Sequence, residues 1–173
     1  MNAEREEAQG TAGAERTTGT AGTAGAHGAE RSQDAAAARA AAERILTATG
    51  DTWAVVGLSD NSARAAYGVA RVLQDFGKRV VPVHPKAETV HGERGYATLA
   101  EIPFPVDVVD VFVNSALAGA VADEAVTIGA KAVWFQLGVV DEEAYARTRS
   151  AGLDMVMDRC PAIEIGALGL DAR

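Results

Sequence analysis

The chain has very little cysteine and no long apolar run. Cys160 is the single cysteine in 173 residues, so no disulfide can form within the chain. This fits a reducing cytoplasm. No apolar run approaches the roughly 18 residues of a membrane-spanning helix, and no apolar signal segment is found, so we expect a soluble protein.

Positive charge is also scarce. The sequence has 16 Lys and Arg against 24 Asp and Glu, a formal net charge of −8, and the basic residues do not cluster. Such a surface is unsuited to nucleic acid or anionic lipid. His84 and His91 have no Cys, His or carboxylate companions at metal-ligand spacing, so no metal site is predicted.

Residues 1–33 lack Val, Ile, Leu, Phe, Trp and Tyr. A segment with so little to bury cannot offset the entropy lost on ordering its backbone. We therefore expect a disordered tail over 1–33 and one folded domain over 34–173, of ordinary size for a single core. That domain is expected to begin with an alanine-rich helix over 34–47, which Gly50 follows.

Apolar runs then alternate with segments of helical spacing. The runs predict strands over 52–57, 79–83, 107–113, 132–137 and 153–157, and the spacing predicts helices over 67–76, 117–128 and 141–150. Strands alternating with helices predict a Rossmann-like, doubly wound α/β domain. It has a mostly parallel five-stranded sheet with helices on both faces. In such folds ligands bind at the carboxyl ends of the strands.

The segment after the first predicted strand reads GLSDNSAR (57–64). It matches neither the dinucleotide-binding nor the P-loop fingerprint. A glycine followed by hydroxyl and amide side chains ahead of a helix can still bind an anion. An ordinary turn with a Ser or Asn helix cap explains the segment equally well.

Lys86 follows the second predicted strand, where an NAD site usually carries an acidic residue. A lysine suits a phosphate on the ribose, as in NADP or coenzyme A. A solvated surface lysine is the plain alternative.

Several motifs occur together in order: WAVVGLSDN, RVVPVHPK, GYATLAEIP, VDVVDVFVNS, GAKAVWFQLGV and MDRCPAIE. Over about residues 44–170 the chain thereby resembles the stand-alone CoA-binding protein family. These proteins are similar to the CoA-binding domain of the succinyl-CoA synthetase alpha subunit. The resemblance implies a CoA site made of Gly57, Ser59, Asp60, Asn61, Arg64, Lys86, Asn114, Ser115, Gln136, Leu137 and Gly138. Gly57, Ser59, Asp60 and Arg64 would face the phosphates, Lys86 would lie near the phosphorylated ribose, and residues 114–115 and 136–138 would line the adenine and pantetheine path.

The chain departs from that family at two places. Ala65-Ala66 stands where relatives often have Pro-Ser, and Val113 where they often have a basic residue. The domain that supplies a phosphorylated histidine in the synthetase has no counterpart here, so ligase chemistry is not implied.

The function predicted from these features is non-catalytic binding of coenzyme A or an acyl-CoA. The alternatives are an NADP-dependent oxidoreductase, a CoA-dependent catalyst that needs a partner chain, and a regulatory or scaffold protein with a vestigial pocket. A protein partner or a homo-oligomer is compatible with all of them.

Five further residues carry smaller predictions. Asp107 and Asp110 are expected at a strand entrance and on a paired or partly exposed face. Asp158-Arg159 is interpreted as a local ion pair. Cys160 is either a buried packing residue or a thiol able to form a disulfide with CoA.

Overall fold

The computed structural model describes residues 23–170, with side chains from residue 31 on. The chain divides into two compact units between Asp34 and Ala35, and every strand among the described residues belongs to the second unit. Helix α1 (Thr23–Thr47) contains that boundary and begins earlier than the predicted start at residue 34. Residues 1–22 of the predicted tail lie outside the described residues, and the domain boundary stays a prediction.

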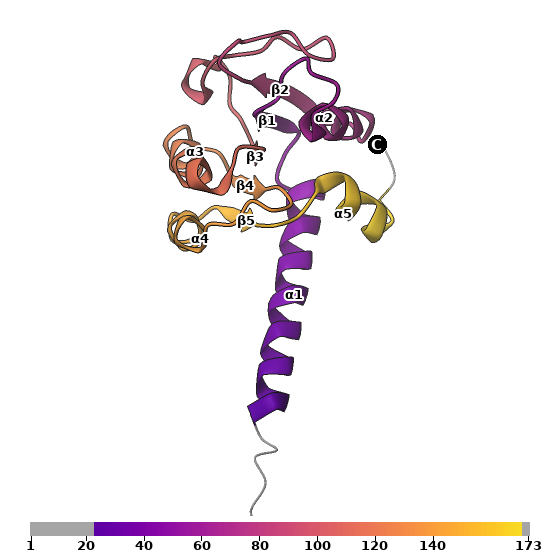
Figure 1. The fold of residues 1–173 in the computed structure, drawn as a ribbon, viewed down its shortest axis with the longest axis vertical. Helices are drawn as coiled ribbons and strands as arrows, with labels where there is room; N and C mark the ends of the chain where they lie inside the picture. The colour runs from indigo at the N-terminus through magenta and orange to yellow at the C-terminus, as the bar shows by residue number, and fades with distance from the viewer. Residues whose placement is uncertain (1–22, 171–173) are drawn as a thin grey trace, which may run out of the picture. The chain divides into compact units, whose positions relative to one another are not determined.

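Within residues 23–170, five strands form one all-parallel sheet in the order β2-β1-β3-β4-β5 (Figure 1). The strands are β1 (Thr52–Val56), β2 (Arg79–Val83), β3 (Val108–Val111), β4 (Ala132–Phe135) and β5 (Asp154–Val156). Each coincides with a predicted apolar run, which is what a strand covered on both faces requires. The Rossmann-like fold class is confirmed.

The chain reverses its direction of travel across the sheet between β1 and β3. It passes from β1 to the edge strand β2, then returns to place β3 on the other side of β1. Connections leaving the carboxyl ends of β1 and β3 therefore diverge, which leaves a crevice where such folds bind ligands.

Helices cover both faces of the sheet (Figure 1). Helices α3 (Ser115–Thr127) and α4 (Glu142–Ser150) lie on one face, and α2 (Ala65–Asp75) and α5 (Pro161–Leu168) on the other. Trp53 of β1 and Trp134 of β4 are fully buried in the core on the α2 and α5 side of the sheet, with ring centroids 5.9 Å apart. Helix α5 was not predicted, although Pro161 at its start and Gly169 just past its end are typical helix boundaries.

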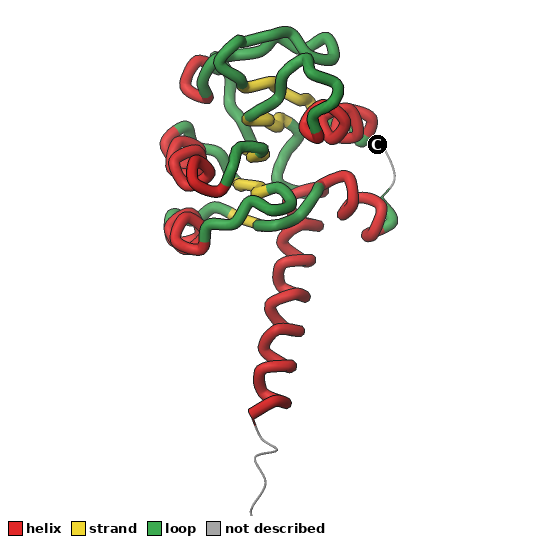
Figure 2. The backbone as a smooth tube through the Cα atoms, viewed as in Figure 1, coloured by secondary structure: helices red, strands yellow, loops and turns green. Residues whose placement is uncertain are grey.

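A long loop connects β2 to β3 and includes the short helix η1 (Leu99–Glu101), as the tube in Figure 2 shows. Tyr96 runs alongside the end of β2: its N–H donates to Pro82 O (2.9 Å), and His84 N–H donates to Tyr96 O (3.0 Å). The loop is thereby tied to the carboxyl end of the sheet's edge strand.

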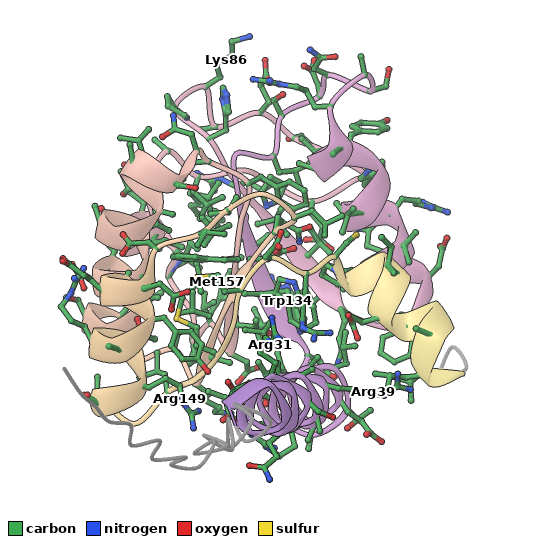
Figure 3. All side chains as sticks on the ribbon, turned by 60° about the horizontal axis from the view of Figure 1, so that its bottom comes forward. Arg31, Arg39, Lys86, Trp134, Arg149 and Met157 are labelled. Carbon is green, nitrogen blue, oxygen red and sulfur yellow. The ribbon has the colours of Figure 1, made fainter. Side chains whose placement is uncertain are left out.

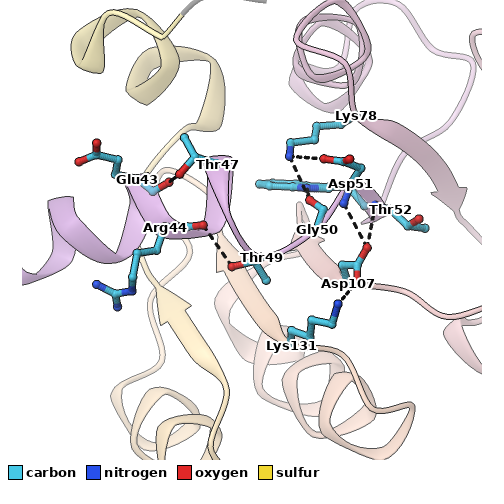
Figure 4. A network of polar contacts seen from close by, with 11 residues as sticks. Glu43, Arg44, Thr47, Thr49, Gly50, Asp51, Thr52, Lys78, Asp107 and Lys131 are labelled. Atoms are coloured by element: carbon cyan, nitrogen blue, oxygen red, sulfur yellow. Dashed lines mark hydrogen bonds and ion pairs between the residues drawn. The ribbon is translucent and has the colours of Figure 1, made fainter. Parts of the chain in front are cut away.

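A polar network links residues at the opposite edge of the sheet, where the strands begin (Figure 4). The buried Lys78 Nζ donates to Gly50 O (3.0 Å) and pairs with Asp51 (2.8 Å). Asp107 accepts from two backbone amides at the start of β1 and pairs with Lys131 (2.7 Å). Burial alone would raise the pKa of Asp107, but these hydrogen bonds and the Lys131 charge lower it below its ordinary value.

No helix among residues 23–170 is long and apolar enough to cross a membrane.

Candidate functional site

A cavity of about 820 Å³ opens at the carboxyl edge of the sheet, where the connections from β1 and β3 diverge. Its walls come from the ends of β1, β2 and β3, the start of α2, the η1 segment, one face of α3 and the loop after β4. The lining residues are Val56, Gly57, Arg64, Ala65, Ala66, Val83, His84, Pro85, Ala97, Thr98, Leu99, Phe112, Val113, Asn114, Leu117, Val121, Glu124, Leu137, Gly138 and Val139.

The loop after β1 brings backbone close to the cavity. Gly57 has φ +97°, and its N–H donates to Val83 O (2.8 Å). A Cβ at this position would lie 3.2 Å from the Phe112 Cβ. The positive φ strongly favours glycine here, and an added Cβ would also make a tight contact with Phe112.

The Ser or Asn cap of α2, which was one of the two interpretations of this segment, is absent. Asn61 Oδ1 accepts from Ala63 N–H (3.0 Å), and Ser59 Oγ accepts from Asn61 N–H (3.4 Å), so both side chains stabilise the loop itself. The N-cap residue is Arg64, whose side chain makes no cap hydrogen bond. Because Ala65 and Ala66 line the cavity, the positive end of the α2 dipole lies at its wall.

The loops after β1 and β2 are bridged by a residue that the sequence reading did not select. Glu88 Oε2 accepts from Asp60 N–H (3.4 Å), and Glu88 Oε1 lies 3.6 Å from Lys86 Nζ. The Lys86 side chain is 67% exposed and extends outward from its loop (Figure 3). Lys86 is thus a solvated lysine, with a carboxylate as its nearest charge.

The loop after β4 is held in place by two side chains. Ser115 Oγ donates to Gly138 O (3.3 Å) and accepts from Val140 N–H (3.0 Å). Asp158, which has φ +55°, accepts from Gly138 N–H (2.7 Å). Asp158 therefore supports the loop at the cavity mouth rather than pairing with Arg159, and the ion-pair interpretation is wrong: Arg159 pairs with Glu164 (2.6 Å).

Gln136 lies beneath the edge and away from the cavity. It is buried, and its Nε2 donates to Asp110 Oδ1 (2.6 Å). Asp110 is fully buried, so it is paired as expected but not partly exposed. Burial raises the pKa of Asp110 to about 7, even though hydrogen bonds from Gln136 and Val111 lower it. Its Oδ2 has no hydrogen-bond partner among the described residues.

The predicted site residues therefore fall into two groups. Five line the cavity: Gly57, Arg64, Asn114, Leu137 and Gly138. Six do not: Ser59, Asp60, Asn61, Lys86, Ser115 and Gln136. Of these six, four lie in the loops after β1 and β2, Ser115 supports the loop after β4, and Gln136 is buried.

Sequence reasoning missed the wall formed by α3. Leu117, Val121 and Glu124 follow Asn114 at intervals of three, four and three residues, which places all four on one helix face. That spacing can be recognised in the sequence, so this wall could have been predicted. The contribution of Thr98 and Leu99, from the η1 segment, was also missed.

Cys160 is a free, buried cysteine that immediately precedes α5. Among the residues that the structure describes, no group of three or more His, Cys, Asp or Glu side chains is arranged to hold a metal ion.

Comparison with known proteins gives consistent results. Residues 51–166 match the family model described as a CoA binding domain. The uncharacterized protein YneT of Bacillus subtilis (strain 168) is 38% identical over 107 residues, which are 62% of this chain and 79% of that protein.

Solved structures are also similar. A hypothetical protein from Pyrococcus horikoshii OT3 has a TM-score of 0.70 and 36% identity, covering 75% of this chain and 91% of that one. The dinucleotide forming acetyl-coenzyme A synthetase 1 of Ca. Korarchaeum cryptofilum has a TM-score of 0.57 and 24% identity. The match covers 67% of this chain and 27% of that enzyme, and it indicates a shared fold.

Proposed function

This chain belongs to the CoA binding domain family, and from that premise we propose that it binds coenzyme A or an acyl-CoA without catalysing a reaction. The observation that carries the proposal is the cavity of about 820 Å³ at the point where the connections from β1 and β3 diverge. Rossmann-like sheets bind nucleotides at this point.

The part of the cavity next to the end of β1 and the amino end of α2 suits phosphate groups. Gly57 allows a close approach of the backbone, and the uncapped amino end of α2 directs N–H groups and a positive dipole end toward the wall. Arg64 adds a positive charge beside them. We assign the pyrophosphate of CoA to this part of the site.

The remainder of the cavity suits apolar parts of the ligand. Val56, Val83, Leu99 and Phe112 form an apolar floor for a stacked base or the pantetheine arm. Leu117 and Leu137 are 55% and 58% exposed at the wall. These two exposed side chains favour an apolar group near the mouth, which is why acyl-CoA stays within the proposal.

We assign the ribose phosphate of CoA to Lys86, beyond the cavity wall. Lys86 is exposed and would contact that phosphate through water-screened attraction, so its contribution is modest. Lys86→Ala should weaken binding of CoA several-fold, and should weaken binding of 3′-dephospho-CoA less.

Isothermal titration calorimetry of the full chain with CoA, 3′-dephospho-CoA and NADP tests this proposal. Lys131→Ala is the matched control, because Lys131 is an equally exposed lysine, paired with a carboxylate at the opposite edge of the sheet. Equal losses for both CoA forms would remove Lys86 from the ribose phosphate. Tighter binding of NADP than of CoA would favour an oxidoreductase.

A further inference from the structure

The Glu88 carboxylate contacts Lys86, to which the proposed function assigns the ribose phosphate, and a backbone amide in the loop after β1. One oxygen accepts from the Asp60 N–H (3.4 Å), and the other lies 3.6 Å from Lys86 Nζ. An amide N–H and an ammonium group are the donors that a phosphate uses in proteins. A carboxylate of this chain therefore satisfies donors suited to a phosphate.

The backbone around Glu88 is fixed by local geometry. Ala87 adopts φ +48°, which is uncommon for a residue with a side chain, and its N–H donates to His84 O (2.7 Å). Gly95 packs so closely on this turn that a Cβ there would lie 2.9 Å from Ala87 C and would overlap the Glu88 carbonyl oxygen. The turn therefore directs Glu88 toward the loop after β1, and its side chain is only 26% exposed.

A phosphate and the Glu88 carboxylate compete for the same donors. The amide N–H of Asp60 has one hydrogen to donate, whereas the Lys86 ammonium group has three and can contact both anions. A phosphate that takes the amide therefore displaces the carboxylate from it and lies beside a like charge. Like charges close together disfavour binding.

We propose that Glu88 is an internal competitor for the ribose phosphate of coenzyme A, and so a specificity-determining residue of this site. The inference rests on the proposed function, because it requires that Lys86 and the loop after β1 receive that phosphate. Glu88 sets the affinity for the phosphorylated ribose below what Lys86 and the amide alone would give. The discrimination between CoA and 3′-dephospho-CoA is correspondingly small in the natural protein.

The variant Glu88→Gln removes the charge and keeps the shape and the capacity to accept a hydrogen bond. We expect it to bind CoA about fivefold more tightly than the natural chain, and to gain less for 3′-dephospho-CoA. Glu93→Gln is the matched control, since it removes the same charge from the same loop, and it should leave both affinities close to those of the natural chain.

Calorimetric titration of the three full-length proteins with the two ligands decides the matter. A larger gain for CoA than for 3′-dephospho-CoA, confined to Glu88→Gln, supports the inference. Equal gains for both ligands, no gain, or a loss overturns it and leaves CoA binding intact; a loss would mean that Glu88 accepts hydrogen bonds from the ligand. If none of the three proteins binds CoA, both the proposed function and the inference fail.

Discussion

Replacement of Asp110 by asparagine should stabilise the protein at neutral pH and above. Asp110 lies on the interior strand β3 with no exposed surface, and one of its oxygens has no hydrogen-bond partner among the described residues. A charge in that position lacks the solvation and pairing that an ionised carboxylate needs. Asparagine has the shape of the neutral acid and can still accept from Gln136.

The magnitude follows from the difference in pKa between the two states. The pKa of Asp110 is about 7 in the folded protein, against an ordinary value of 3.8. A difference of about three pH units corresponds to about 4 kcal/mol of unfolding free energy, an upper bound. Because the folded pKa is raised, the unfolded chain releases its proton first. The contribution of Asp110 to stability is therefore most favourable below about pH 4, falls between about pH 4 and pH 7, and is constant above about pH 7.

Urea unfolding of the natural chain and Asp110→Asn at pH 4, 6 and 8 measures this difference. The two proteins should be nearly equal at pH 4, and the variant should be more stable by up to about 4 kcal/mol at pH 8. Asp75→Asn, at an exposed helix position paired with Arg71, is the control and should show no such rise. A difference that does not grow between pH 4 and pH 8 would refute the argument.

Three further outcomes are expected. Gly57→Ala should lower the unfolding free energy by roughly 1–3 kcal/mol and weaken CoA binding. The reason is that Gly57 has φ +97° and an added Cβ would lie 3.2 Å from the Phe112 Cβ. Unchanged thermal unfolding and CoA-binding curves would contradict this. The hydrogen bond from Arg44, then that from Arg149, lowers the pKa of Asp154 against the effect of burial. The natural chain should therefore lose stability below about pH 4, and Asp154→Asn should lose less. Parallel acid-unfolding curves for the two proteins would argue against a stabilising role of the Arg44–Asp154 and Arg149–Asp154 pairs. Removal of residues 1–33 should leave melting temperature and CoA affinity unchanged, whereas a fall of several degrees would place the domain boundary earlier.

The sequence was sufficient to predict the fold because the features that define it are local and repeated. All five strands lie within the mostly apolar runs predicted as strands, and the four predicted helices all occur, since burial on both faces and helical spacing leave direct traces in the sequence. The start of α1 was placed at residue 34 because residues 23–33 have no large apolar side chain, whereas in the structure the helix begins at Thr23. Helix α5 was missed although Pro161 and Gly169 mark its two ends.

The candidate site was harder to predict because side-chain direction there depends on turns. Glu88 meets Asp60 across a turn in which Ala87 has positive φ, and nothing in the local sequence requires that conformation. The direction of Gln136 could have been inferred, since residues two apart on a strand share a face and Trp134 is buried. Gln136 was instead placed in the site because the family resemblance implied it.

The central claim is that coenzyme A binds at the carboxyl edge between β1 and β3. Titration of the isotope-labelled full chain with CoA, followed by amide chemical shifts, tests it most directly. The account predicts shift changes concentrated at Gly57, Ala65 and Gly138 around the cavity, with Gly50 and Lys131 at the opposite edge unaffected. Unchanged spectra at millimolar CoA, or changes centred on the opposite edge, would contradict it.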